Sequence, residues 1–126
     1  MIAFPNCKIN LGLSILEKRL DGYHALETVF YPVALQDNLE ILSHPITTQA
    51  VGDELPQVQF SSSGIPVPGD PMNNLCIKAY HLLKKDFPFI GPIQMHLHKN
   101  IPMGAGLGGG SSDGTKALEM INELFK

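Results

Sequence analysis

Residues 102–113 read Pro-Met-Gly-Ala-Gly-Leu-Gly-Gly-Gly-Ser-Ser-Asp, and this stretch decides how the rest of the chain is interpreted. Five glycines fall within the seven positions from Gly104 to Gly110. Glycine lets the backbone adopt positive φ and approach a ligand closely. Consecutive backbone N–H groups, together with the positive end of a helix that follows them, favour an anion such as a phosphate group. Ser111 and Ser112 add hydroxyl groups at the expected start of that helix.

Other interpretations of this glycine-rich loop are less favoured. A Gly-x-Gly-x-x-Gly pattern is present at Gly104, Gly106 and Gly109, but a dinucleotide fingerprint needs an acidic residue about twenty residues later in a βαβ unit. A P-loop needs Lys followed by Ser or Thr after its last glycine, whereas Gly110 is followed by Ser111. A turn without a ligand needs one or two glycines, and each glycine costs about 0.5–1 kcal/mol of backbone entropy relative to alanine.

The composition indicates one folded domain and narrows its partners. The 126 residues are 44% hydrophobic and 17% charged, which excludes a disordered chain. The net charge is −3 and no basic stripe is present, so we expect no nucleic-acid partner. No long apolar run and no leader after Met1 are visible, so we expect no membrane partner and a cytoplasmic location. Cys7 and Cys76 are interpreted as free thiols.

The order of the expected elements favours an α+β fold. Hydrophobic periodicity and turn residues predict strands at residues 9–15, 26–35, 39–42, 58–60 and 93–97. A tight turn is expected at Asp21-Gly22 and a loop at residues 61–64, and helices are expected to begin near Asn74 and Ser111. Strands run together before the first helix, so we expect a mixed or antiparallel sheet with helices on one face, and residues 9–15 as a central strand.

Residues 102–112 resemble the ATP phosphate-binding motif of the GHMP kinases. Residues 8–13 (Lys-Ile-Asn-Leu-Gly-Leu) and 19–28 (Arg-Leu-Asp-Gly-Tyr-His-Ala-Leu-Glu-Thr) resemble the opening strand and hairpin of the branch that acts on 4-diphosphocytidyl-2-C-methyl-D-erythritol. Residues 74–79 match the start of the family's first helix. The resemblance covers nearly the whole chain in order and implies the ribosomal protein S5 domain 2-like fold of a GHMP kinase N-terminal domain. Gly114 departs from the motif, which usually has alanine there.

The resemblance implies a small-molecule kinase. Its expected reaction moves the γ-phosphate of ATP, with Mg²⁺, to the 2-hydroxyl of that cytidine diphosphate-linked methylerythritol, a step of mevalonate-independent isoprenoid synthesis. Residues 1–126 would form the N-terminal domain, with the catalytic aspartate and a C-terminal domain after Lys126. We therefore expect the isolated chain to be inactive, and homodimers are compatible with the apolar surface that it would expose. The alternatives are a non-catalytic nucleotide-binding module and a GHMP kinase with another small alcohol substrate.

The resemblance also assigns site residues. Lys8 is the expected catalytic lysine, facing the substrate hydroxyl and the γ-phosphate, and Asn10 is expected to hold the methylerythritol. Tyr23 and His24 are expected to bracket the cytidine by stacking and by a hydrogen bond to the base. The expected ATP-binding residues are Pro102, Gly104, Gly106, Leu107, Gly108, Gly109, Gly110, Ser111, Ser112 and Lys99. Ser112 is also the expected Mg²⁺ ligand. For each side chain the alternative is an ordinary exposed residue.

Two further features allow a metal interpretation that we do not favour. His96 and His98 form a His-x-His pattern, but zinc takes three or four ligands and no cysteine or aspartate lies near them in the sequence. They are interpreted as exposed histidines on the polar side of a strand. Asp113 falls in the first turn of the last expected helix, where a carboxylate complements the helix dipole, so capping is preferred to metal binding.

Overall fold

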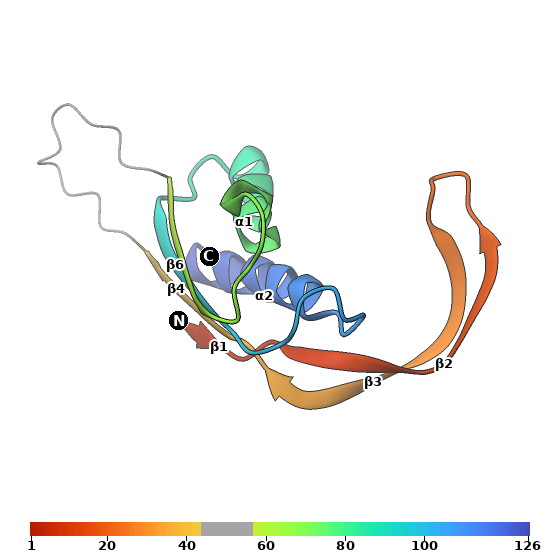
Figure 1. Ribbon diagram of the computed structural model, residues 1–126. Helices are drawn as coiled ribbons and strands as arrows, with labels where there is room; N and C mark the ends of the chain where they lie inside the picture. The colour runs from red at the N-terminus through yellow and green to blue at the C-terminus, as the bar shows by residue number, and fades with distance from the viewer. Residues whose placement is uncertain (44–56) are drawn as a thin grey trace, which may run out of the picture.

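The computed structural model describes residues 1–43 and 57–126, which form two sheets and two long helices (Figure 1). The elements in chain order are β1 (Ile2–Ala3), β2 (Asn6–Lys18), β3 (His24–Gln36), β4 (Asn38–Ser43), β5 (Val58–Gly64), the short 3₁₀ turn η1 (Pro71–Asn73), α1 (Leu75–Asp86), β6 (Ile93–Lys99) and α2 (Gly109–Leu124). Residues 44–56, for which the sequence predicts no strand or helix, lie outside the described residues.

The main sheet has four strands in the order β1-β4-β6-β5. β4 runs antiparallel to both β1 and β6, while β5 runs parallel to β6. A parallel pair needs a crossover connection, and α1 lies in the segment that joins β5 to β6. Both helices cover the same face of the sheet (Figure 1). The expected α+β class, with a mixed sheet and helices on one face, is therefore confirmed.

The core lies between this sheet and the helices. Leu39 and Ile41 of β4 are fully buried, and Ile41 pairs with the equally buried Met95 of β6. Side chains alternate between the two faces of a strand, so these apolar residues form one continuous surface. Tyr80 of α1 and Ile121 of α2 pack against it and are also fully buried. The alternation that is visible in the sequence thus identifies the covered face of the sheet.

β2 and β3 form a separate antiparallel sheet, a long hairpin that curves away from the core (Figure 1). Its turn is the predicted one: Arg19 N donates to Tyr23 O at 2.7 Å, and Gly22 has φ of +86°. The prediction that residues 9–15 form a central strand is wrong, because Leu13 and Ile15 are 55% and 65% exposed. Alternation of apolar and polar residues indicates that a strand has an apolar face, but it does not indicate which element covers that face.

Ser61, Ser62 and Ser63 were expected in a loop, and this expectation is wrong. They belong to β5 and pair in parallel register with residues 96–98 of β6. Serine has little intrinsic preference for strands. Here two of the serine hydroxyl groups have hydrogen-bond partners on the neighbouring strand. Ser61 Oγ and Ser63 Oγ lie 2.7 and 2.9 Å from the two ring nitrogens of His96.

The helices begin close to the predicted positions. Asn74 caps α1, accepting a hydrogen bond from Cys76 N at 2.9 Å, as expected. The buried face of α1 includes Cys76 and Tyr80, whereas Leu82 is 56% exposed. α2 begins at Gly109 rather than at Ser111. Within residues 1–43 and 57–126, no helix is both long enough and apolar enough to cross a membrane.

Gly114 lies where α2 packs closely against the first residue of α1. A Cβ atom at Gly114 would lie 2.9 Å from Leu75 Cβ, which is too close for two non-bonded carbon atoms. In an open helix, replacing glycine by alanine stabilises by about 1 kcal/mol. At this crossing we expect Gly114→Ala to lower the free energy of unfolding by about 1–3 kcal/mol, because the helices must move apart. Urea denaturation of the purified protein measures this change.

Gly110→Ala is the matched control, since its added Cβ would have Leu75 Cδ1 as nearest neighbour at 4.0 Å. This control is expected to leave the free energy of unfolding unchanged or slightly raised. A Gly114→Ala protein as stable as the Gly110→Ala protein would contradict the crossing argument.

Candidate functional site

The glycine-rich loop joins β6 to α2 and presents open backbone donors. Gly104, Gly106 and Gly108 have φ of +72°, +72° and +73°, a conformation that side-chain-bearing residues rarely adopt. Gly108 is the N-cap of α2, and among the described residues no side chain caps this helix. The first N–H groups of a helix have no partner within it. The loop therefore ends in a cluster of donors at a positive helix end, which suits an anion.

Lys8 binds this loop through both its backbone and its side chain. Its N–H group donates to Leu107 O at 2.9 Å. Its ammonium group donates to Gly106 O at 2.6 Å and to Asn10 Oδ1 at 2.7 Å, and lies 5.2 Å from the centre of the Phe30 ring. The structure therefore brings Lys8, Asn10 and the loop together. Phe30 was not predicted, because only the pairing of β2 with β3 places its ring beside Lys8.

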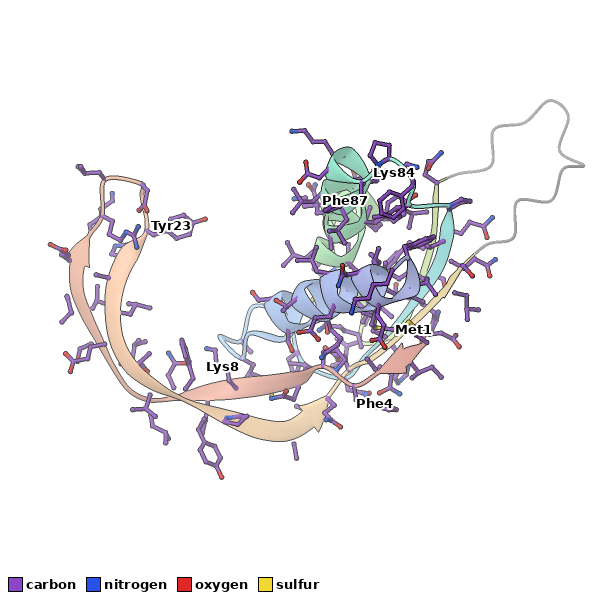
Figure 2. All side chains as sticks on the ribbon, turned by 180° about the vertical axis from the view of Figure 1, so that it is seen from behind. Met1, Phe4, Lys8, Tyr23, Lys84 and Phe87 are labelled. Carbon is purple, nitrogen blue, oxygen red and sulfur yellow. The ribbon has the colours of Figure 1, made fainter. Side chains whose placement is uncertain are left out.

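Tyr23 and His24 lie at the other end of the same hairpin. Figure 2 shows Tyr23 at the tip of the curved hairpin and Lys8 near its base. Tyr23 is 74% exposed and His24 is exposed as well. The structure does not place these two residues beside Lys8, so a single ligand that contacts all three must be elongated.

Lys99 has different surroundings from those that the sequence suggests. Its ammonium group is buried and pairs with Asp37 Oδ2 and, at 2.8 Å, with Asp113 Oδ2. Asp37 Oδ1 accepts hydrogen bonds from Asn100 N at 2.6 Å and from Ile101 N at 2.8 Å. We call Asp37, Lys99 and Asp113 the Asp37 cluster. The expected capping role of Asp113 is wrong, because its carboxylate faces Lys99 in the interior and does not cap α2.

Burial and ion pairing act in opposite directions on the pKa values of this cluster. Burial raises the pKa of Asp113 to about 6, although the hydrogen bond from Lys99 acts to lower it. Burial would also raise the pKa of Asp37, but the hydrogen bonds from Lys99, Ile101 N and Asn100 N outweigh it and lower that pKa. Burial would lower the pKa of Lys99, but its bonds to Asp113 and Asp37 raise it. The ammonium group therefore stays charged at neutral pH.

Several hollows flank the start of α2. A cavity of about 120 Å³ is lined by Val67, Pro68, Asp70, Asn73, Asn74, Leu75, Leu97, Lys99, Met103, Gly110 and Asp113. Its lining is mainly apolar, and Asn73 and Asn74 provide amide groups beside it. A more open hollow of about 400 Å³ on another side of α2 is lined in part by Ser111, Ser112 and Lys116. The start of α2 thus lies between a partly enclosed, mainly apolar cavity and a more open hollow.

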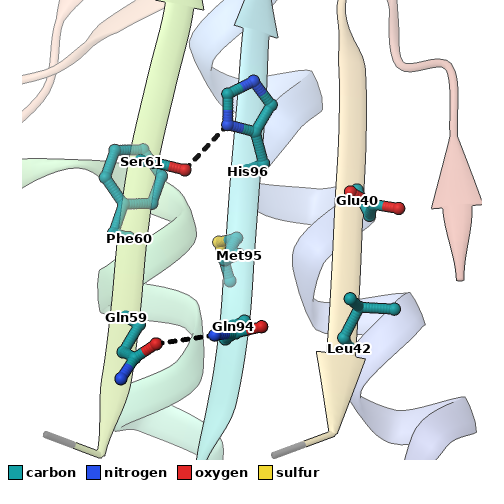
Figure 3. Close-up of a pocket in the computed structure, with 8 residues that line it drawn as sticks. All are labelled: Glu40, Leu42, Gln59, Phe60, Ser61, Gln94, Met95 and His96. Atoms are coloured by element: carbon teal, nitrogen blue, oxygen red, sulfur yellow. Dashed lines mark hydrogen bonds between the residues drawn. The ribbon is translucent and has the colours of Figure 1, made fainter.

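A further hollow of about 390 Å³ lies on the uncovered face of the main sheet (Figure 3). It is lined by residues of β4, β5 and β6, and none of the predicted site residues is among them. His96 and His98, from which a zinc site was considered, are half-buried on this face. Both ring nitrogens of His96 lie within hydrogen-bond distance of serine hydroxyl groups. Within the described part of the chain, no three His, Cys, Asp or Glu residues gather as metal ligands.

Comparison with known proteins identifies relatives of this arrangement. Residues 74–126 match the family described as GHMP kinases N terminal domain. The chain is 54% identical over 126 residues to the 4-diphosphocytidyl-2-C-methyl-D-erythritol kinase of Bacteroides thetaiotaomicron, covering 100% of this chain and 43% of that protein. It is 50% identical over 125 residues to the kinase of the same name from Cytophaga hutchinsonii, covering 99% and 42%.

A solved structure agrees with these relatives. The crystal structure of 4-(cytidine 5'-diphospho)-2C-methyl-D-erythritol kinase superposes with a TM-score of 0.75 at 34% identity, covering 99% of this chain and 41% of that one. The chain therefore spans less than half the length of the relatives it matches. These matches confirm the resemblance and the fold class that the sequence predicts. The roles of individual site residues stay predictions, supported by the geometry described above.

The Asp37 cluster is expected to dominate the stability of the site. Asp37→Ala leaves the backbone N–H groups of Asn100 and Ile101, of which the second is buried, without their acceptor. It also removes one of the two carboxylates that face Lys99. We expect the free energy of unfolding to fall by about 3–5 kcal/mol, as for other broken buried ion pairs. Urea denaturation at pH 7 measures the change.

Asp21→Ala is the matched control, because Asp21 also pairs with a cation, Arg19, at 2.7 Å, but both side chains are largely exposed. Surface pairs contribute about 0–1 kcal/mol, so this variant is expected to stay within that range. Equal losses in the two variants would show that burial of the cluster does not matter.

Proposed function

We propose, from the premise that residues 74–126 belong to the GHMP kinase N-terminal domain family, that this chain supplies the ATP-binding surface and part of the substrate-binding surface of a small-molecule kinase. The proposed reaction transfers the γ-phosphoryl group of ATP to the 2-hydroxyl of 4-diphosphocytidyl-2-C-methyl-D-erythritol. ADP leaves and the hydroxyl group loses its proton. The names of the relatives, at 54% and 50% identity over nearly the whole chain, support this choice of substrate.

One observation carries the proposal: the ammonium group of Lys8 lies at the glycine-rich loop, bonded to Gly106 O and to Asn10. Phosphoryl transfer depends on positioning and on neutralising charge at the γ-phosphate. A fixed cation beside an open helix N-terminus provides both. A turn with a purely structural purpose needs no such cation, so the pairing of Lys8 with the loop favours a catalytic site.

The residues that would hold ATP and Mg²⁺ follow from the same geometry. The backbone N–H groups of Gly109, Gly110 and Ser111 are the first of α2, and no side chain among the described residues caps them. They would bind phosphate oxygens. The hydroxyl group of Ser112, beside the open hollow, would serve as a Mg²⁺ ligand, since this ion prefers oxygen ligands and usually takes few from the protein. When bound, Mg²⁺ supplies positive charge to the phosphates. The other residues proposed to bind ATP are those predicted between Pro102 and Ser112.

The partly enclosed cavity beside the loop is the proposed place for the base of ATP. Its apolar lining suits a flat aromatic ring, and the Asn73 and Asn74 amide groups can bond polar edges. Lys99 lies in the wall of this cavity, although its ammonium group is held by two carboxylates. We therefore expect Lys99 to contact the nucleotide as part of the cavity wall, and not through its ammonium group.

The hairpin is the proposed site for the alcohol substrate. Asn10, whose side chain bonds Lys8, would hold the hydroxyl-bearing part of the substrate. Tyr23, at the tip of the hairpin in Figure 2, and the next residue, His24, would hold the cytidine. This separation suits an elongated substrate better than a small alcohol, and a cytidine diphosphate conjugate is elongated. A cytoplasmic location and a homodimer stay predictions from the sequence.

The function is tested by changing Lys8 in the full-length protein. Lys8→Met is expected to lower kcat by about 10²–10³, because it removes one preorganised positive group from the transition state. Affinity for a non-hydrolysable ATP analogue should change less, since the backbone of Lys8 still bonds Leu107. A coupled ADP-release assay and calorimetric titration measure the two quantities.

Lys18→Met, at the exposed far end of the same strand, is the matched control and should keep kcat within about twofold. A full-length protein that binds the ATP analogue but phosphorylates neither this substrate nor other small alcohols would instead be a non-catalytic nucleotide-binding module. Turnover with mevalonate or homoserine alone would assign another substrate.

The 126-residue chain by itself is expected to show no turnover with ATP, Mg²⁺ and the substrate. It contains Lys8 and the loop, but the acid-base group expected to pair with Lys8 is predicted to follow Lys126. Such a group contributes typically about 10²–10⁴ in rate. The same assay, run on the isolated chain and the full-length protein, gives the comparison, and isolated-chain turnover within tenfold of the full-length value would contradict this assignment.

A further inference from the structure

The Asp37 cluster joins three segments that are far apart in the sequence. Asp37 lies between β3 and β4, Lys99 is the last residue of β6, and Asp113 lies in the first turns of α2. The exposed fractions of their side chains in these ion pairs are 0%, 1% and 3%. The ion pairs are therefore almost completely buried, and the cluster lies next to both ends of the glycine-rich loop.

The cluster holds both ends of that loop. On the entry side, Asp37 Oδ1 accepts from the backbone N–H groups of Asn100 and Ile101 at 2.6 and 2.8 Å. On the exit side, Lys99 Nζ donates to Asp113 Oδ2 at 2.8 Å. A Cβ at Gly109 would lie 3.2 Å from Lys99 Nζ and 2.7 Å from Ile101 Cγ2, so the backbone at the start of α2 lies against the cluster.

The cluster is a costly way to stabilise a fold. Two carboxylates face one ammonium group, and among the described residues Asp113 Oδ1 is buried with no hydrogen-bond partner. Buried ion pairs often contribute no more stability than well-packed apolar side chains of similar volume. Their hydrogen bonds are directional, however, and an apolar contact would not fix the loop ends at one separation.

Resting on the proposed function, we propose that Asp113, together with Asp37 and Lys99, positions the glycine-rich loop for the nucleotide phosphates. The three side chains act through the backbone of the loop and touch no phosphate themselves. When the Lys99–Asp113 link is broken, the start of α2 is released from the end of β6, and the phosphate-binding N–H groups lose their common orientation. Nucleotide affinity therefore depends on the link more strongly than the chemical step does.

Asp113→Ala and Asp113→Asn in the full-length protein are the discriminating pair. The alanine variant removes the acceptor for Lys99 but leaves Asp37 and Lys99 as a neutral buried pair, so the protein is expected to fold. The asparagine variant keeps an oxygen acceptor at the same place. Asp113→Ser, which shortens the side chain but keeps a polar atom, carries the same expectation as Asp113→Ala and replaces it if the alanine variant unfolds.

Two quantities are measured. The first is amide hydrogen exchange, without nucleotide, at the bonded amides that flank the loop: Asn100, Ile101 and Ser112. The second is the Kd of a non-hydrolysable ATP analogue with Mg²⁺ by calorimetry. For Asp113→Ala we expect exchange at least tenfold faster and a Kd at least tenfold higher. Asp113→Asn is expected to keep the Kd within about threefold. Tyr80→Phe, which removes hydroxyl hydrogen bonds to Gln57 and Gly91 in the core, is the control for general destabilisation and should leave both quantities unchanged.

The outcomes separate the inference from the proposed function. The positioning role is overturned if a folded Asp113→Ala or Asp113→Ser protein keeps its amide exchange and its Kd within twofold of wild type. This holds also when the variant loses thermal stability but nothing else. Equal loosening of the loop in Tyr80→Phe overturns it as well. If the variant exchanges faster but the wild-type protein binds no nucleotide, the positioning role is supported and the kinase proposal is contradicted.

Discussion

The buried ammonium group of Lys99 is the interaction on which the rest of the structure depends. Lys99 ends β6, an inner strand of the main sheet, and its two carboxylate partners come from the β3–β4 connection and from α2. A charge in the interior must be paired and hydrogen-bonded. The segments that carry Asp37 and Asp113 can therefore meet β6 in few ways, and the glycine-rich loop between β6 and α2 receives a defined shape.

The hairpin is oriented by the loop rather than by a core of its own. The N–H group of Lys8 bonds Leu107 O and its ammonium group bonds Gly106 O, so the base of β2 follows the loop. Beyond this contact, the apolar side chains of Leu13 and Ile15 are exposed. A two-stranded ribbon is marginally stable in water, so its attachment at the base decides where Tyr23 and His24 stand relative to Lys8.

Local signals predicted much of the fold. The Asp21-Gly22 turn, the Asn74 cap and the glycine-rich loop are each determined by a few neighbouring residues, and the structure contains all three. Several expectations that depended on distant partners were wrong. Ser61–Ser63 form a strand because β6 supplies partners, and residues 9–15 lie in the hairpin because no layer of the described residues covers them.

The sequence by itself determined which backbone conformations and which chemical groups are available: positive φ at the loop glycines, open donors at a helix start, and a lysine on an early strand. Only the tertiary structure decided which groups meet. Asp37 lies 62 residues before Lys99 in the chain, and Asp113 lies 14 residues after it. Pairing over such separations depends on the packing of the whole sheet against α2, and no local pattern encodes it. Asp37 was therefore missed, and Asp113 was assigned to the helix cap that its own neighbours suggest.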